Sequence, residues 1–174
     1  MAAYDPFKSF NAKAARYGWA CSCDPTLAFT RSKLALVAKL WRDRAGPGSV
    51  PRRSDFDARA LLPVISNMTL LEDIGGRYKL RLHGTALTQY AGDHTGRFVD
   101  EMMGTGYADS YVQLYDLVLC EARPLRVLWD YQVPAISYLQ GESFVAPLAG
   151  ADGRTSMILS VTYASAKSRN LAAA

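Results

Sequence analysis

Apolar residues recur at steps of three and four positions in two long stretches of the chain. In residues 26–45 they include Leu34, Val37 and Trp41, and residues 107–122 repeat the same spacing. This spacing places apolar side chains on one face of an α-helix. The pattern therefore predicts two amphipathic helices.

Five other segments have the alternation, or the β-branched and aliphatic content, that is typical of strands. These predicted strands are residues 64–73, 77–83, 125–133, 138–148 and 156–164. The glycine pair 75–76 can supply the positive φ angles of a tight turn, so the first two strands are expected to form a hairpin. In the second strand Tyr78, Leu80 and Leu82 are expected on one face, which places His83 on the other.

The order of these elements predicts an α+β fold. Two strands come first, short helices and the longer helix follow, and three strands end the domain. This order gives a five-stranded antiparallel sheet with helices over one face and an N-terminal flanking helix. The predicted organisation is an irregular segment at 1–25, the flanking helix at 26–45, the domain at 46–164 and a tail at 165–174. Apolar residues near helical spacing in the first segment would also allow a short amphipathic helix there.

The charge balance is only mildly basic. The chain of 174 residues has 20 Lys and Arg against 16 Asp and Glu, a net charge of +4, and 49% of its residues are hydrophobic. These values fit one globular domain. The densest basic cluster, around Arg52 and Arg53, is interrupted by Asp43 and Asp55. We interpret it as a solvated loop and expect no nucleic-acid partner.

Cysteine usage and hydropathy bear on localisation. The chain has three cysteines, an odd number in a chain too long to need disulfides, which favours free thiols in a reducing compartment. The first residues lack the apolar core of a secretory signal, and no apolar run approaches the ~20 residues that span a bilayer. We therefore expect a cytoplasmic protein without membrane contact.

Several short motifs stand in the order found in a known family. They are Trp41, Pro-Arg-Arg-Ser-Asp-Phe-Asp at 51–57, Leu-Leu-Pro at 61–63, Arg-Tyr-Lys-Leu-Arg-Leu-His-Gly-Thr at 77–85, Leu87, Gly92, Thr-Gly-Arg at 95–97, Ala-Pro-Leu at 146–148 and Asp-Gly at 152–153. Over roughly residues 33–164 this set resembles a PAS domain, and more narrowly the stand-alone PAS-type domains of unknown function of alphaproteobacteria. The resemblance implies a bacterial sensory or regulatory role and carries over no catalytic residue.

Aromatic residues supply the candidates for a binding site. The side chains expected to face the space between sheet and helices are Tyr78, Leu80, Leu87, Tyr111, Tyr115 and Trp129, and Tyr90, Tyr131 and Tyr163 are also expected to point inward. Tyrosine joins an apolar ring to a polar tip, which suits a pocket for a small apolar or amphipathic ligand. The alternative is that these rings simply fill the core.

Haem, flavin and zinc are not expected as cofactors. The two histidines, His83 and His94, are assigned to the opposite strand face and to a polar loop, where neither would be a haem ligand. Cys120 lacks the short motif of a light-sensing flavin domain. Cys21 and Cys23 offer only two of the four ligands of a structural zinc site, so no metal site is predicted.

The resemblance also implies a homodimer, since PAS domains commonly dimerise through a flanking helix. Leu34, Val37 and Trp41 are then the candidates for the symmetric contact. The same apolar stripe can instead pack on the sheet of its own chain. The sequence does not separate these two arrangements.

The sequence favours a non-catalytic sensory module. A small molecule, a protein partner or both would bind, and the output would pass through a signalling partner. One alternative is a ligand-free dimerisation or adaptor module. Another is an enzyme resembling ketosteroid isomerases, with Asp116 or Asp130 as the base and Tyr111 or Tyr115 as a hydrogen-bond donor.

Overall fold

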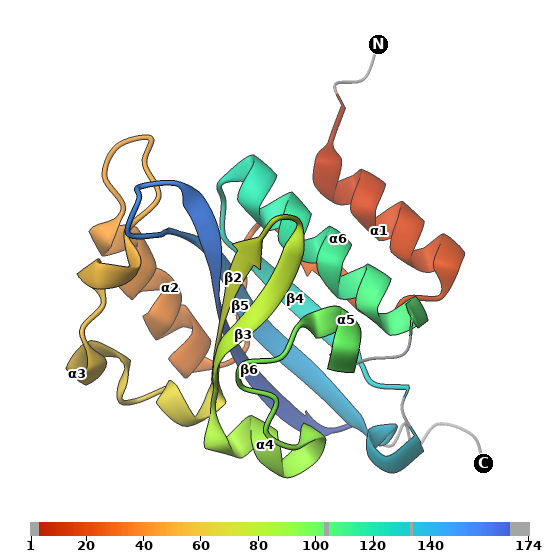
Figure 1. Cartoon of the computed structure of the whole chain (residues 1–174). Coiled ribbons are helices and arrows are strands. Elements are labelled where there is room, and N and C mark those ends of the chain that lie inside the picture. Colours follow the sequence, from red (N-terminus) through yellow and green to blue (C-terminus); the bar gives the residue numbers. More distant parts are fainter. Residues whose placement is uncertain (1–3, 103–104, 133, 168–174) are drawn as a thin grey trace.

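One antiparallel sheet crosses the molecule and has helices on both faces (Figure 1). The computed structural model describes residues 4–102, 105–132 and 134–167. The strands, in the sheet order β1-β4-β5-β6-β2-β3, are β1 Cys21–Asp24, β2 Met68–Ile74, β3 Arg77–His83, β4 Leu125–Asp130, β5 Leu139–Ala149 and β6 Thr155–Ala166. The helices are α1 Pro6–Tyr17, α2 Ser32–Arg44, α3 Ala58–Leu61, α4 Thr85–Ala91, α5 Val99–Met102 and α6 Thr105–Glu121. Short 3-10 turns occur at η1 Arg53–Asp55, η2 Ile65–Asn67 and η3 Pro134–Ile136.

The predicted α+β fold is confirmed, with one strand more than expected. Strands β2 to β6 correspond to the five predicted strands, and Gly75 and Gly76 turn the β2–β3 hairpin with φ angles of +65° and +84°. The additional strand, β1, pairs with β4 at the edge of the sheet. A strand of four residues is too short for its alternation to be recognised in a sequence. On its free side, the side-chain amide of Asn11 bonds to both the N–H and the carbonyl of Cys23, which shields this edge.

Residues 1–25 were expected to form an irregular segment, but the structure shows regular elements there. Besides β1, its described part contains the helix α1. The carboxylate of Asp5 accepts hydrogen bonds from two backbone N–H groups of the first turn, and Gly18 ends the helix with a φ of +66°. The buried rings of Phe7 and Phe10 hold α1 in the core. The helical spacing of these residues was the correct signal.

The helix α2 begins later than predicted. Residue 26 was the expected start, but Leu27 has a φ of +57°, which lies outside the helical region. The helix begins at Ser32. The segment before it is therefore a loop that leads from β1 across to the other face of the sheet.

The side chains of α2 belong to the core of the same chain. Leu34 and Val37 are fully buried, and they pack with Phe144 of β5. The indole N–H of Trp41 donates to the backbone carbonyl of Pro147 at 2.9 Å. Figure 1 shows α2 across this face, with the short helix α3 on the same side of the sheet. The face under α2 is thus an apolar core closed by this helix and by the segment that contains α3, which contributes Phe56 and Leu61.

The opposite face is covered by α4, α5, α6 and α1. Helices α1 and α6 lie side by side there (Figure 1), and Lys13 donates to Gln113 across them. Leu114 and Val118 of α6 are fully buried against the sheet. This layer is built from four helices, of which α6 with 17 residues is the longest.

A bulge in β3 reverses the faces of its last residues. Residues 70–71 of β2 pair with Leu82 and Leu80, so Arg81 has no partner on β2. An extra residue in one strand shifts the alternation by one position. Leu82 therefore packs in the core under α2, whereas His83 turns toward α4–α6. The expectation that Leu80 and Leu82 share a face is wrong for this reason.

Two further sequence expectations concern the ends of the chain and the membrane. The tail expected at 165–174 lies mostly outside the described residues, and β6 runs to Ala166. Among the helices that the structure describes, none is long and apolar enough to cross a membrane.

Candidate functional site

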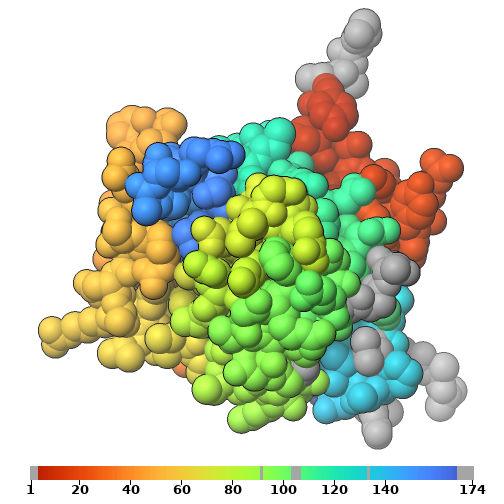
Figure 2. Space-filling model, viewed as in Figure 1, coloured from red at the N-terminus to blue at the C-terminus, as the bar shows by residue number. Residues whose placement is uncertain are grey.

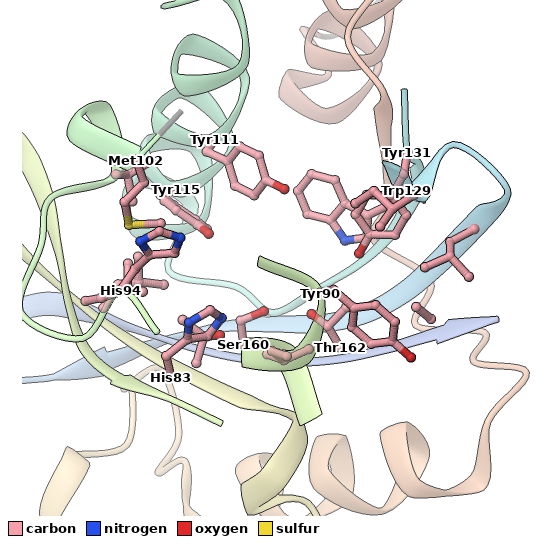
Figure 3. Close-up of a pocket in the computed structure, with 18 residues that line it drawn as sticks. His83, Tyr90, His94, Met102, Tyr111, Tyr115, Trp129, Tyr131, Ser160 and Thr162 are labelled. Carbon is pink, nitrogen blue, oxygen red and sulfur yellow. The ribbon is translucent and has the colours of Figure 1, made fainter. Parts of the chain in front are cut away.

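A cavity of about 260 Å³ lies between the sheet and the layer formed by α4–α6 (Figure 3). In the space-filling view the chain from β3 to α5 forms the near surface over this part of the sheet (Figure 2). The side chains around the cavity come from five strands, three helices and two connecting segments. They are Thr69, Leu71, Leu80, His83, Leu87, Tyr90, His94, Val99, Met102, Tyr111, Tyr115, Trp129, Tyr131, Ile136, Leu139, Ser160, Thr162 and Ala164.

One wall of the cavity is a stack of aromatic rings. The rings of Tyr111 and Trp129 are nearly parallel, with centroids 4.8 Å apart and an interplanar angle of 17°. The indole N–H of Trp129 donates to the hydroxyl of Ser143 at 2.7 Å, which fixes the ring on the sheet. Glycine at position 141 makes room for this wall, because a Cβ there would lie 3.0 Å from the Tyr131 hydroxyl and 3.2 Å from the Trp129 ring. The wall is therefore fixed by the fold.

Three tyrosines bring phenol groups to the cavity. Figure 3 shows the hydroxyls of Tyr111 and Tyr115 pointing into the space between α6 and the sheet. Burial raises the pKa of both phenols well above the ordinary value, and burial raises the pKa of Tyr131 to about 12. All three groups are therefore neutral at physiological pH and can donate or accept a hydrogen bond.

The two histidines also line this cavity, which the sequence did not predict. The imidazoles of His83 and His94 are stacked, with centroids 6.2 Å apart (Figure 3). Burial, and then the neighbouring His94, lower the pKa of His83, while Asp93 and a backbone hydrogen bond to Gly92 act in the opposite direction. Strand parity assigned His83 to the wrong face because the bulge at Arg81 cannot be seen in the sequence.

Apart from the two histidines, the described residues that line the cavity have no side chain that is charged at neutral pH. Among the described residues around the cavity there is no Asp, Glu, Lys or Arg. The site is thus an apolar and aromatic space with neutral hydroxyls and two imidazoles. Such a lining can select a ligand by shape, ring stacking and hydrogen bonds.

Comparison with known proteins identifies the family. A family model described as a PAS domain matches residues 29–162, which is most of the chain and includes α2. The chain belongs to the PAS domain family. This PAS domain is accordingly a sensory or regulatory domain in general terms, of a family whose members generally bind small ligands or proteins.

A solved structure gives a more distant likeness. An RNA-binding Light-Oxygen-Voltage receptor is 15% identical and has a TM-score of 0.42, and the match covers 66% of this chain and 36% of that chain. This PAS domain thus spans little more than a third of the receptor chain. No curated protein matches the sequence.

Five of the six predicted pocket residues lie around the cavity. They are Leu80, Leu87, Tyr111, Tyr115 and Trp129. The sixth, Tyr78, is buried deeper, and its hydroxyl donates to the carboxylate of Asp116 at 2.6 Å. The alternation of the strand assigned Tyr78 to the correct face, but it cannot tell which residues of that face border the cavity.

The other aromatic candidates divide between the two faces. Tyr90 and Tyr131 line the cavity, and Tyr90 is half exposed at its rim. Tyr163 lies on the α2 side instead, where the cations of Arg31 and Lys33 lie over its ring. The expectation that Tyr163 points toward the pocket is therefore wrong.

The carboxylates considered for an isomerase lie away from the cavity. Asp116 is exposed and accepts from Tyr78, and Asp130 pairs with Lys167. Neither belongs to the cavity lining, so the geometry gives neither one the position of a general base against a ligand there.

The three residues proposed for a dimer contact are buried within the protomer. Leu34, Val37 and Trp41 pack on β5 and its neighbours, which is the second of the two arrangements considered. They are therefore not available to a second copy of the chain. Homodimerisation stays a prediction, without these residues as its surface.

The cysteines also lie away from the cavity. Cys21 and Cys23 are buried on β1 and Cys120 is exposed on α6, and burial raises the pKa of the Cys21 thiol to about 12. Within the described ranges there is no group of three or more His, Cys, Asp or Glu side chains placed to hold a metal ion.

Proposed function

We propose that this PAS domain senses a small amphipathic molecule in the cavity and passes the signal to a protein partner. The observation that carries the proposal is the lining, with a fixed aromatic wall and neutral polar groups around an otherwise apolar space. Ligand pockets are typically apolar with a few placed polar groups, and they measure about 300–1,000 Å³ for drug-sized ligands. At about 260 Å³ the cavity suits a ligand of one or two rings.

The contacts of Trp129 supply a route from ligand to surface. Its indole is bonded to Ser143 on β5, and that hydroxyl is 2.7 Å from the hydroxyl of Thr162 on β6. A ligand in contact with Trp129 would therefore act on three adjacent strands. Residues of β5 and β6 on the other face contact α2, so a shift in these strands would alter the α2 side of the molecule.

Mass spectrometry of the purified protein tests the ligand directly. We expect native spectra of protein from a bacterial lysate to show an additional mass that disappears on denaturation. The variant Leu87→Trp replaces a leucine at the cavity wall by a larger aromatic side chain that fills part of the space, so the additional mass should disappear. The control is Leu40→Trp, the same change at a partly buried position of a helix on the opposite face of the sheet. It should retain the mass.

Thermal unfolding distinguishes the remaining outcomes. A ligand that binds only the folded state raises the Tm, and it should do so in the wild type and Leu40→Trp but not in Leu87→Trp. Protein without additional mass that forms a fixed oligomer would contradict the proposal. That result would favour the ligand-free adaptor instead.

A further inference from the structure

The two ends of the cavity differ in chemistry. Figure 3 shows His83, His94 and Met102 at one end, and Trp129 and Tyr131 at the other. The hydroxyls of Tyr111 and Tyr115 lie between the two ends. A ligand that satisfies the whole space is therefore itself two-sided, with a ring at one end and a polar group at the other.

The histidines are the lining side chains that can carry a positive charge. No described lining residue carries a negative charge, so a buried ammonium group would find no counter-ion in the wall. A carboxylate would instead meet imidazolium and phenol donors, which form strong charge-assisted hydrogen bonds. The Nδ1 atom of His83 is buried and has no partner among the described residues. Buried polar atoms in folded proteins nearly always have one, so a hydrogen-bonding group of a ligand would satisfy this atom.

We propose that the ligand is a small aromatic carboxylic acid, with its carboxylate against the His83–His94 pair and its ring against the Trp129 wall. This inference rests on the proposed function, because it names the class of molecule that the same cavity would take.

Binding of such an acid should take up a proton. Burial lowers the pKa of His83, so this imidazole is neutral in the free cavity at neutral pH, and a bound carboxylate would raise that pKa. The ionisable groups acting on His83 are His94 and Asp93, both in the segment after α4, and the lining contributed by β2, α5, α6 and β4–β6 is uncharged at neutral pH. Affinity should therefore increase as pH falls, by at most about tenfold per pH unit, the limit for one proton.

An aromatic cage for a quaternary ammonium ion is the main rival. Cations can bind over the faces of Trp and Tyr. Here, however, Tyr111 and Trp129 are stacked on each other at 4.8 Å, so each ring has one face covered by the other. A protonated histidine at the far end would also repel a cation.

Three probes with one ring system separate these possibilities. We would measure binding of 2-naphthylacetate, its neutral amide and 2-naphthylethylammonium by titration calorimetry at pH 6, 7 and 8. The carboxylate of the acid is ionised throughout this range. The acid should bind at least tenfold tighter than the amide at pH 6, its affinity should decline toward pH 8, and the affinity of the amide should not change with pH. Calorimetry in buffers of different ionisation enthalpy should show proton uptake for the acid alone.

The variants His83→Gln and His94→Gln assign the effect to the imidazoles. Glutamine can form hydrogen bonds but does not titrate, so the acid should bind these variants no better than the amide does and without pH dependence. Unchanged amide binding shows that the cavity is intact. The inference is overturned if acid and amide bind equally, if the ammonium probe binds best, if these variants keep the pH dependence of acid binding, or if no probe binds. The proposed function is tested separately, by the additional mass in native spectra. A negative result with these probes therefore overturns the aromatic acid without overturning a ligand in the cavity.

Discussion

The two faces of the sheet are covered in different ways, although the same strands supply both. Under α2, one helix of 13 residues lies over Phe144 and Leu159, and these side chains are shielded from solvent almost completely. Over the opposite face, α4, α5 and α6 leave a cavity of about 260 Å³ above the strand residues whose side chains point away from α2. One face resembles an ordinary protein core, and the other combines a core with a binding site.

Their polar groups differ as well. On the α2 side, the buried carboxylate of Glu142 is fully engaged by Arg126 at 2.6 Å and by the N–H and hydroxyl of Thr30. On the cavity side, phenols and imidazoles face a shared space. The comparison indicates that stability depends most on the α2 face, whereas ligand recognition depends on the cavity face.

Removal of the Arg126 guanidinium should have the largest effect on stability. Glu142 is only 6% exposed, so Arg126→Met would leave its charge buried with Thr30 as its remaining partner. Breaking a buried ion pair in this way costs about 3–5 kcal/mol. Urea unfolding at pH 7 measures the loss, and the double variant with Glu142→Gln should recover much of it.

The same pair predicts a pH dependence. Burial alone would raise the pKa of Glu142, but the hydrogen bonds from Thr30 and Arg126 outweigh it and hold the pKa below its ordinary value. The stabilisation is therefore complete above the unfolded-state pKa of about 4.3 and is lost as pH falls through the lower, folded-state pKa. The difference between wild type and Arg126→Met should shrink below about pH 4. A constant difference would contradict an ionic role for the pair.

Truncation of one leucine on each face compares the two covers directly. Leu34 is fully buried under α2, so Leu34→Ala should lower the free energy of unfolding by about 2–5 kcal/mol. Leu87 borders the cavity and is only partly buried, so Leu87→Ala should cost less than about 1.5 kcal/mol, since much of its surface has no packed neighbour to lose. Equal losses would show that the cavity face is packed as tightly as the other.

Addition of one methylene tests the same contrast from the opposite direction. Val37 under α2 and Val99 at the cavity are both buried valines. Val37→Ile adds volume to a filled core and should destabilise by about 1–3 kcal/mol. Val99→Ile can extend into the cavity and should be neutral or stabilising by up to about 0.8 kcal/mol. Matched denaturant curves are sufficient for this test, and destabilisation by Val99→Ile would contradict the assigned space.

Much of this contrast was visible in the sequence. Helical spacing identified the face of α6 that carries Tyr111 and Tyr115, and strand alternation placed Trp129 on the same side. The Gly75-Gly76 turn located the hairpin. These signals are local, and each depends on a period that the chain keeps over several residues.

The parts that escaped prediction depend on long-range pairing. The bulge at Arg81 exists only because β2 pairs with β3 in a particular register, and it moves His83 into the cavity. Strand β1 becomes a strand by pairing with β4, more than a hundred residues away. The sequence also could not say that Tyr78, on the correct face of β3, would reach Asp116 on α6 instead of the cavity.

Tyr78 and Tyr111 therefore offer the finest comparison, between a tyrosine that holds the fold and one that faces the cavity. Tyr78→Phe removes a hydrogen bond to an exposed carboxylate and should cost about 1 kcal/mol. Burial, and then the hydrogen bond to Asp116, raise the pKa of Tyr78, so its stabilisation is complete below the unfolded-state pKa of about 10 and declines at higher pH. Tyr111→Phe should change stability less, because the ring stacking on Trp129 is retained. Affinity for a cavity ligand should respond in the opposite order, falling in Tyr111→Phe and staying constant in Tyr78→Phe. If both variants lost affinity equally, the deeper tyrosine would have to be assigned to the binding site after all.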